Sequence, residues 1–181
     1  GVQTCALPIY EWKKIVEIEE LDGYSATELA KIRVDEAYCL NLQIPVYIDV
    51  MTYANNRELR EEIYRAYISR ASEVGITSKD FDNQQVMNDI LRLRCELAQL
   101  LGFENYASLS IESKMVSSLD EVVDFLDELV TRSKAQAEAE LDELKSFAGH
   151  ELEPWDLIHY SEKLKQQKFC YKRSDLTPYF P

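Results

Sequence analysis

The stretch from residue 84 to residue 105 constrains the fold more than any other part of this sequence. Its apolar side chains recur at steps of four, three, four and three residues, the spacing of one helix face: Val86, Ile90, Leu93, Leu97 and Leu100. Gly102 can take the left-handed conformation that ends a helix, and Phe103 can fold back onto the last turn. Asn105 is a typical N-cap residue. The pattern predicts a long helix, a Schellman end and the start of another helix.

Helical spacing continues over most of the chain. The 181 residues include five glycines and five prolines, and between these breaks the apolar residues recur at helical rather than alternating intervals. Start signals for further helices are a capping box at Ser25–Glu28, another at Ser118–Glu121 with a helix to about Ala148, and a first-turn proline at Pro154. The predicted fold class is all-α, a multi-helix segment without a linker that separates domains.

The first fifty residues give weaker signals. Residues 10–20 are interpreted as the end of a helix, and a helix through about Val34 is expected to follow the Ser25 cap. Residues 38–44 alternate less clearly and precede Pro45, which favours an extended link. At most one short strand is therefore expected, near residues 38–44.

A helix with one charged face is predicted after Asn55, which is interpreted as the cap acceptor with Glu58 three residues on. Its apolar face consists of Leu59, Ile63, Ala66 and Tyr67. The residues assigned to the opposite, solvated face are Arg57, Arg60, Glu61 and Arg65. Contact of these arginines with a substrate is the alternative interpretation.

The net charge of −13 argues against two classes of partner. An acidic surface repels phosphate backbones and anionic lipid, so we expect neither nucleic-acid nor membrane-surface binding. No stretch approaches 18 apolar residues and no basic-then-apolar leader is visible, so neither a membrane span nor a signal peptide is predicted. The cysteines outside the first nine residues are widely spaced and odd in number, which fits reduced thiols of a cytoplasmic protein: Cys39, Cys95 and Cys170. Cys95 is interpreted as a packing residue.

Residues 1–9 do not look like native protein. One back-translation of this stretch, GVQTCALPI, matches a common short-read sequencing adapter. We therefore exclude it from fold reasoning, as for an expression scar; the alternative is a native N-terminal arm. The remaining residues, 10–181, are expected to be one partial helical domain, and the sequence to be a truncated gene fragment.

The histidines do not form a recognised zinc motif. Zinc hydrolysis needs imidazole and carboxylate ligands that converge on one ion and leave a position open for water. The run from His150 to Pro154 begins like His-Glu-x-x-His but has proline at the second histidine position. The other histidine, His159, lies beyond that proline, so exposed or capping roles are expected for both. No catalytic, cofactor-binding or metal-binding residue is predicted in this chain.

Other catalytic patterns are also missing from the sequence. The glycines form no phosphate-binding loop, and adjacent acidic pairs such as Asp120–Glu121 diverge around a helix. Among the 11 tyrosines, four could line a peptide channel, although aromatic residues at helical spacing are more often core: Tyr64, Tyr67, Tyr106 and Tyr160.

Four segments in a fixed order carry a family resemblance. They are IPVYIDVMTYANNRELREEIYRAYISRAS (44–72), NDILRLRCELAQLLGFENYASLS (88–110), PWDLIHYSEK (154–163) and LTPYFP (176–181). Together they resemble the zinc-dependent oligopeptidase A and thimet oligopeptidase family. The resemblance covers roughly residues 10–181. It departs from the family in a short link at 149–153 and in His159, where the family often has tyrosine.

The resemblance implies a function for a larger protein. Members of that family are mostly helical, monomeric, cytoplasmic zinc metalloendopeptidases whose two halves enclose a channel for short peptides. Their zinc lies on a His-Glu-x-x-His helix with a further glutamate, downstream of the segments matched here, so residues 10–181 would be scaffold upstream of the metal half. Faces such as Leu59/Ile63/Tyr67 and Leu126/Leu129 are expected to need that missing half for burial. The alternative is a non-enzymatic, acidic, helical protein-interaction module.

Overall fold

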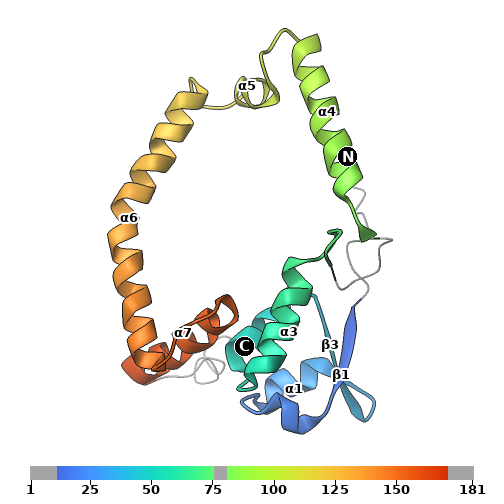
Figure 1. Cartoon of the computed structure of the whole chain (residues 1–181), viewed down its shortest axis with the longest axis vertical. Coiled ribbons are helices and arrows are strands. Elements are labelled where there is room, and N and C mark those ends of the chain that lie inside the picture. Colours follow the sequence, from blue (N-terminus) through green and yellow to red (C-terminus); the bar gives the residue numbers. More distant parts are fainter. Residues whose placement is uncertain (1–11, 76–80, 171–181) are drawn as a thin grey trace, which may run out of the picture. The chain divides into compact units, whose positions relative to one another are not determined.

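The computed structural model describes residues 12–75 and 81–170, and the chain divides into two compact units. Unit 1 comprises residues 1–81 and 142–181, and unit 2 comprises residues 82–141. Figure 1 shows the order of the elements, and each unit is described by itself. The adapter-like stretch at residues 1–9 and the motif at 176–181 lie outside the described residues.

Unit 1 contains a small antiparallel sheet in the order β1-β3-β2. The strands are β1 (Lys13–Val16), β2 (Arg33–Val34) and β3 (Ala37–Asn41), with Lys13 opposite Asn41 and Arg33 opposite Tyr38. The extended segment expected near residues 38–44 is thus confirmed as β3. The helix end predicted over residues 10–20 is wrong, because the β-branched pair Ile15-Val16 joins the sheet and only a short 3-10 turn (η1, Ile18–Leu21) follows.

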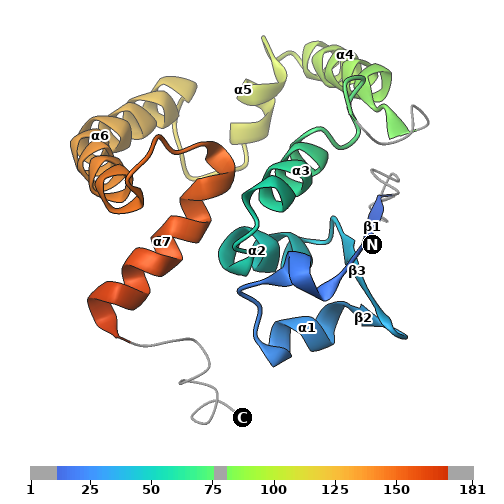
Figure 2. The ribbon, with the colours of Figure 1, turned by 60° about the horizontal axis from the view of Figure 1, so that its bottom comes forward.

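Four helices complete unit 1: α1 (Ala26–Ile32), α2 (Ile44–Tyr53), α3 (Arg57–Ile68) and α7 (Pro154–Phe169). The predicted capping box starts α1, where the Ser25 hydroxyl accepts from the Thr27 N–H and Glu28 accepts from the Ser25 N–H. Pro154 starts α7 as predicted. In Figure 2, α2 lies between α7 and the sheet, and α2, α3 and α7 contact one another.

The cap of α3 is Asn56 rather than the predicted Asn55. The Asn56 Oδ1 atom accepts from the Leu59 N–H at 3.2 Å. The Asn55 side chain is engaged elsewhere, since it donates to Asp22 at 3.0 Å and accepts from Lys163 at 3.0 Å. Asn55 therefore ties the turn after η1 to α7.

Gly23 makes the approach of that turn to α2 feasible. Its φ is +99°, and a Cβ atom there would lie 2.1 Å from the Tyr53 carbonyl oxygen. Only glycine fits a backbone contact this close without displacement of one chain.

The hydrophobic core of the described residues lies in unit 1 and draws on its sheet, η1 and three of its helices. Its buried members are Val16, Leu21, Ile32, Leu40, Leu42, Tyr47, Val50, Met51, Ala54, Leu59, Ile63 and Ala66. Leu59 and Ile63 are fully packed here, so the expectation that this face needs further polypeptide is wrong.

Unit 2 consists of α4 (Gln84–Leu100), α5 (Tyr106–Ile111) and most of α6 (Leu119–Ala148), whose last residues belong to unit 1. The Schellman end of α4 is confirmed: the Phe103 N–H donates to Ala98 at 2.9 Å, the Gly102 N–H to Gln99 at 3.0 Å, and Gly102 has φ +83°. Asn105 caps α5 through the Ser108 N–H at 2.9 Å.

The start of α6 differs slightly from the predicted capping box. Ser118 Oγ accepts from the Glu121 N–H at 3.1 Å as expected, but the Glu121 carboxylate accepts from Ser117 rather than from Ser118.

Burial is scarce in unit 2, where Ala98 is the single buried residue among 82–141. The mostly helical class is confirmed for both units, but only unit 1 has a core. In the part of the chain that the structure describes, no helix combines the length and apolarity needed to cross a bilayer.

Candidate functional site

The strongest polar constellation is a buried ion cluster that joins α3 to α7. At its centre lies the Asp156 carboxylate, 0% exposed. Arg57 donates to it from Nε at 3.1 Å and from Nη2 at 2.6 Å, and Arg60 donates from Nη2 at 2.8 Å. The Glu153 N–H donates at 3.1 Å. Two guanidinium groups and a backbone amide therefore surround one carboxylate.

Arg60 is the buried arm of this cluster, at 1% exposure. Its Nη1 donates to the carbonyls of Ala54 at 2.7 Å and Asn55 at 3.2 Å, and its Nε donates to the Trp155 carbonyl at 3.1 Å. The Ala54 and Asn55 carbonyls follow the C-terminal end of α2, where carbonyls lack partners within the helix. The Trp155 carbonyl lies in the first turn of α7. Arg60 thus holds three helices of unit 1 together.

The assignment of Arg60 to a solvated face is wrong, and its position explains why. Residues seven apart lie on the same side of a helix, and Arg60 precedes Tyr67 by seven residues, on the side that packs against the core. Arg57 is half-exposed and Arg65 is exposed, so the prediction fails chiefly at Arg60. Asp156 gave no signal in the sequence beyond its place in the first turn of a helix.

The cluster keeps Asp156 ionised. Burial alone would raise the pKa of this carboxyl group, but hydrogen bonds from Arg57 and Arg60 outweigh it and lower the pKa to about 2. A carboxylate with every approach occupied cannot accept a substrate proton or attack a carbonyl group. The geometry supports attachment of α7 rather than catalysis.

His159 lies next to this cluster and is buried, which contradicts the exposed or capping role expected for it. Its Nδ1 lies 3.1 Å from the Thr52 carbonyl oxygen, where the neutral tautomer with hydrogen on Nδ1 can donate. Burial, followed by repulsion from Arg60 and Lys163, lowers its pKa to about 4. His159 is therefore a neutral packing residue between α7 and α2 near neutral pH.

His150 has the exposed position that was expected. Its Nδ1 lies 2.7 Å from the Glu151 carbonyl oxygen and its Nε2 lies 2.9 Å from the Tyr160 hydroxyl. Both nitrogens thus have partners within the chain. Over residues 12–75 and 81–170, no three His, Cys, Asp or Glu side chains converge as metal ligands, so these residues do not fit a zinc ion.

The four tyrosines named from the sequence occupy different surroundings. Tyr67 stacks on Tyr47 with ring centroids 3.9 Å apart, and Tyr64 packs against Trp155 at 5.7 Å. Both lie against the core, as favoured. Tyr160 packs between the two histidines, and Tyr106 in unit 2 lies 5.0 Å from the Arg94 guanidinium. They do not line one common channel within either unit.

The cysteines Cys39, Cys95 and Cys170 are free thiols in the structure. Cys95 is exposed on α4, so its interpretation as a packing residue is wrong.

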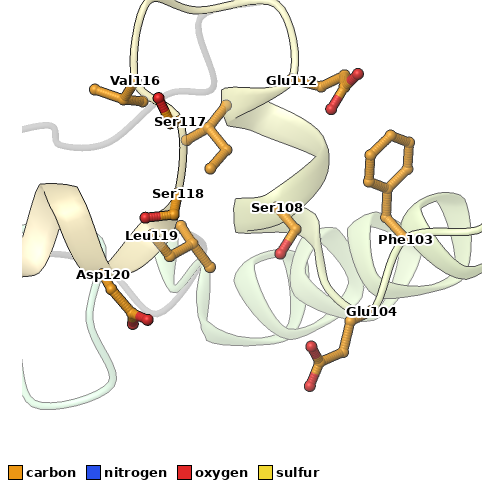
Figure 3. Close-up of a pocket in the computed structure, with 10 residues that line it drawn as sticks. Phe103, Glu104, Ser108, Glu112, Val116, Ser117, Ser118, Leu119 and Asp120 are labelled. Atoms are coloured by element: carbon orange, nitrogen blue, oxygen red, sulfur yellow. The ribbon is translucent and has the colours of Figure 1, made fainter.

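A cavity of about 450 Å³ lies within unit 2 beside α5. Figure 3 shows Ser108 between Glu104 on one side and the 118–120 stretch on the other. The lining residues are Phe103, Glu104, Ser108, Ile111, Glu112, Val116, Ser117, Ser118, Leu119 and Asp120. Three carboxylates and three hydroxyls without a histidine or cysteine provide no nucleophile–base pair.

The geometry of these residues does not identify the family of the chain, whereas comparison with known proteins does. The family model described as "Peptidase family M3" matches residues 50–181. The chain is 47% identical to Oligopeptidase A of Escherichia coli over 94% of its own length and 27% of that protein. It is 39% identical to the probable cytosolic oligopeptidase A of Arabidopsis thaliana, over 79% of the chain and 20% of the relative.

A more distant relative is the dipeptidyl carboxypeptidase of Escherichia coli, 25% identical over 91% of the chain and 25% of that protein. The chain thus spans about a quarter of the length of the relatives it matches. The family model covers more than half of the chain, including all of unit 2, α3 and α7. This chain belongs to peptidase family M3.

Proposed function

We propose that this chain is part of a cytoplasmic, monomeric zinc metalloendopeptidase that hydrolyses short oligopeptides, and that residues 10–181 are scaffold rather than active centre. The observation that carries the proposal is the 47% identity to Oligopeptidase A over nearly the whole chain. Hydrolysis would belong to the complete protein.

The scaffold role is inferred from the described residues, in which both histidines and the buried Asp156 carboxylate already have partners within the protein. Metal-activated hydrolysis needs three protein ligands and an open coordination position. Both nitrogens of His150 have protein partners, and His159 is buried against the Thr52 carbonyl. The buried carboxylate of Asp156 forms ion pairs with two arginines, Arg57 and Arg60. None of these groups is free to bind zinc, and no step of the reaction is assigned to them.

A chimera provides the sharpest test of this proposal. Residues 10–181 would replace the matching stretch of Escherichia coli Oligopeptidase A. We expect the chimera to cleave a quenched-fluorescent oligopeptide and chelator to abolish the cleavage. Oligopeptidase A that lacks the stretch altogether is the control and should be inactive.

The 181-residue chain alone should bind no stoichiometric zinc by metal analysis and should not cleave the same peptide. Chelator-sensitive turnover by the chain alone would contradict the scaffold role. A folded but inactive chimera would contradict membership in a working oligopeptidase, and would favour a non-enzymatic interaction module.

A further inference from the structure

The surface of unit 2 has an apolar face that its own residues leave uncovered. On α6 the large apolar side chains between residues 122 and 130 occupy one side of the helix, and five of them are between 47% and 60% exposed: Val123, Phe125, Leu126, Leu129 and Val130. These five side chains form the α6 face. Leu126 and Leu129, whose burial is expected to need the missing half of the protein, are exposed in this chain.

Helix α4 presents a second such surface. The stripe predicted from the sequence is between 37% and 83% exposed along its whole length: Val86, Ile90, Leu93, Leu97 and Leu100. Soluble monomers rarely expose contiguous apolar patches of this kind, and larger ones mark interaction surfaces. Helices also gain most of their stability from packing of the amphipathic face rather than from intrinsic propensity. Both faces therefore require a covering surface.

Charge on α6 defines what that covering surface must look like. Residues 119–131 contain five carboxylates and no lysine or arginine: Asp120, Glu121, Asp124, Asp127 and Glu128. With about 100° of rotation per residue, the carboxylates fall on the side opposite the apolar residues and along its borders. The helix dipole accounts for acidic residues in the first turn, but it does not reach Asp127 or Glu128. A complementary surface has an apolar centre and a basic rim.

A second copy of this chain fits the α6 face poorly. A symmetric contact would bring the same carboxylates of two copies toward one another, and like charges across an interface cost several kcal/mol. The family match points to another occupant. Peptidase family M3 covers all of unit 2, so α4 and α6 belong to the family's own architecture, while the chain spans only 27% of Oligopeptidase A.

We propose that the α6 face and the α4 stripe are the docking surface for the remaining polypeptide of the complete family protein, which covers α6 with an apolar surface bordered by lysine and arginine. This inference rests on membership in the family and not on the proposed hydrolytic activity. It makes unit 2 an internal interface element, ordered by the chain that packs on it.

The test compares two glutamate substitutions on α6, each made in two proteins. Leu129→Glu places a charge at the centre of the α6 face, and Ala135→Glu places the same charge at an exposed alanine on the opposite side of the same helix. Each is introduced into the Oligopeptidase A chimera and into the 181-residue chain. Thermal unfolding, followed by circular dichroism, and sedimentation velocity are the readouts, neither of which depends on activity.

We expect Leu129→Glu to lower the thermal midpoint of the chimera by several degrees and Ala135→Glu to leave it unchanged. In the 181-residue chain neither substitution should matter, because Leu129 is already exposed there. Lysine in place of Asp127, a carboxylate at the border of the apolar face, should also destabilise the chimera alone, through loss of the match to a basic rim.

Equal tolerance of Leu129→Glu and Ala135→Glu in a folded chimera would overturn the proposal. A stable dimer of the 181-residue chain that dissociates on Leu129→Glu would assign the face to a second copy instead. Failure of the unsubstituted chimera to form a soluble monomer would also count against the docking surface. A folded but inactive chimera that shows the expected effect of Leu129→Glu would contradict only the proposed function.

Discussion

The two units are built from equally regular helices, yet only one of them has an interior. Helices α3 in unit 1 and α4 in unit 2 both carry apolar residues at helical spacing, but Leu59 and Ile63 are buried whereas Ile90 and Leu97 are exposed. In unit 1 the sheet and α7 pack against the other helices. In unit 2 α5 contacts α4, but the apolar stripe of α4 and the apolar face of α6 stay exposed. Periodicity specifies which side of a helix needs a partner, but not whether the partner lies in the same chain.

A difference in cooperativity should follow from this difference in packing. Both tryptophans, Trp12 and Trp155, pack against the core of unit 1. Tryptophan fluorescence therefore reports on unit 1, while far-ultraviolet circular dichroism reports on the helices of both units. The predictions below use the two signals to separate the units.

The largest effect is expected at the ion cluster. Arg60→Met leaves the fully buried Asp156 with the half-exposed Arg57 as its cationic partner, and breakage of a buried ion pair costs about 3–5 kcal/mol. We expect urea unfolding of unit 1, followed by tryptophan fluorescence, to shift by that amount. Arg65→Met is the comparison on the same helix: its ion pair with Glu61 is exposed, and its guanidinium lies 5.1 Å from the Trp155 ring centroid. Exposed contacts of these two kinds each contribute at most about 1 kcal/mol.

A double variant sharpens this result. Replacement of Asp156 by Leu together with Arg60→Met removes the unpaired charge, so the double variant should be more stable than Arg60→Met alone. Equal losses for Arg60→Met and Arg65→Met would show that α7 is held by its apolar contacts and not by the ion cluster.

The next largest effect is a difference in the stability loss that a leucine-to-alanine substitution causes in the two units. Leu40→Ala removes a fully buried side chain of unit 1 and should cost about 2–5 kcal/mol. Leu129→Ala on α6 removes an exposed side chain, and we expect a change within about 0.5 kcal/mol. Urea titrations with fluorescence detection measure the first, and circular dichroism measures the second. A loss above 1 kcal/mol for Leu129→Ala would mean that unit 2 has an interior after all.

The sequence predicted the helices of both units well and the contacts between them poorly. Helix starts and ends at Ser25, Gly102, Asn105 and Pro154 follow from local backbone chemistry, which a short stretch of sequence contains. Strand β1 was missed because its pairing with β3 depends on residues more than twenty positions away. Local patterns cannot report such a partner.

The candidate site was missed for the same reason. Arg60 is buried because α7 supplies Asp156, 96 residues away in the chain, and His159 is buried because α2 lies against it. A charged residue is normally assigned to the surface, and only its partner justifies burial. The absence of a predicted catalytic residue stays a prediction.

A smaller, pH-dependent effect should also be confined to unit 1. The pKa of His159 is about 4 in the folded chain and about 6.5 when unfolded. Between these values the unfolded state binds a proton that the folded state does not, so stability falls as pH is lowered from 6.5 to 4. The slope should not exceed about 1.4 kcal/mol per pH unit.

Asp156 contributes in a separate window. Its folded pKa, about 2, lies below the unfolded value, so its contribution is present above pH 4 and is lost as pH falls through 2. Urea midpoints measured at several pH values should therefore assign the loss between pH 6.5 and 4 to His159. His159→Gln should reduce this slope. An unchanged slope in His159→Gln would contradict a neutral, buried His159.

The smallest effect is expected from deletion of residues 1–9. This stretch has no charged side chain, capping pattern or amphipathic spacing, and the interpretation as an adapter-derived segment predicts no selection for contacts with unit 1. The fluorescence-detected free energy of unfolding should therefore stay within about 0.5 kcal/mol of that of the full chain. Deletion through Lys14 is the control, because it removes half of β1 and its pairing with Asn41 and Leu40, and it should destabilise unit 1 clearly. If the shorter deletion proves as damaging as the longer one, residues 1–9 contribute to the fold of unit 1 and the native-arm interpretation is the correct one.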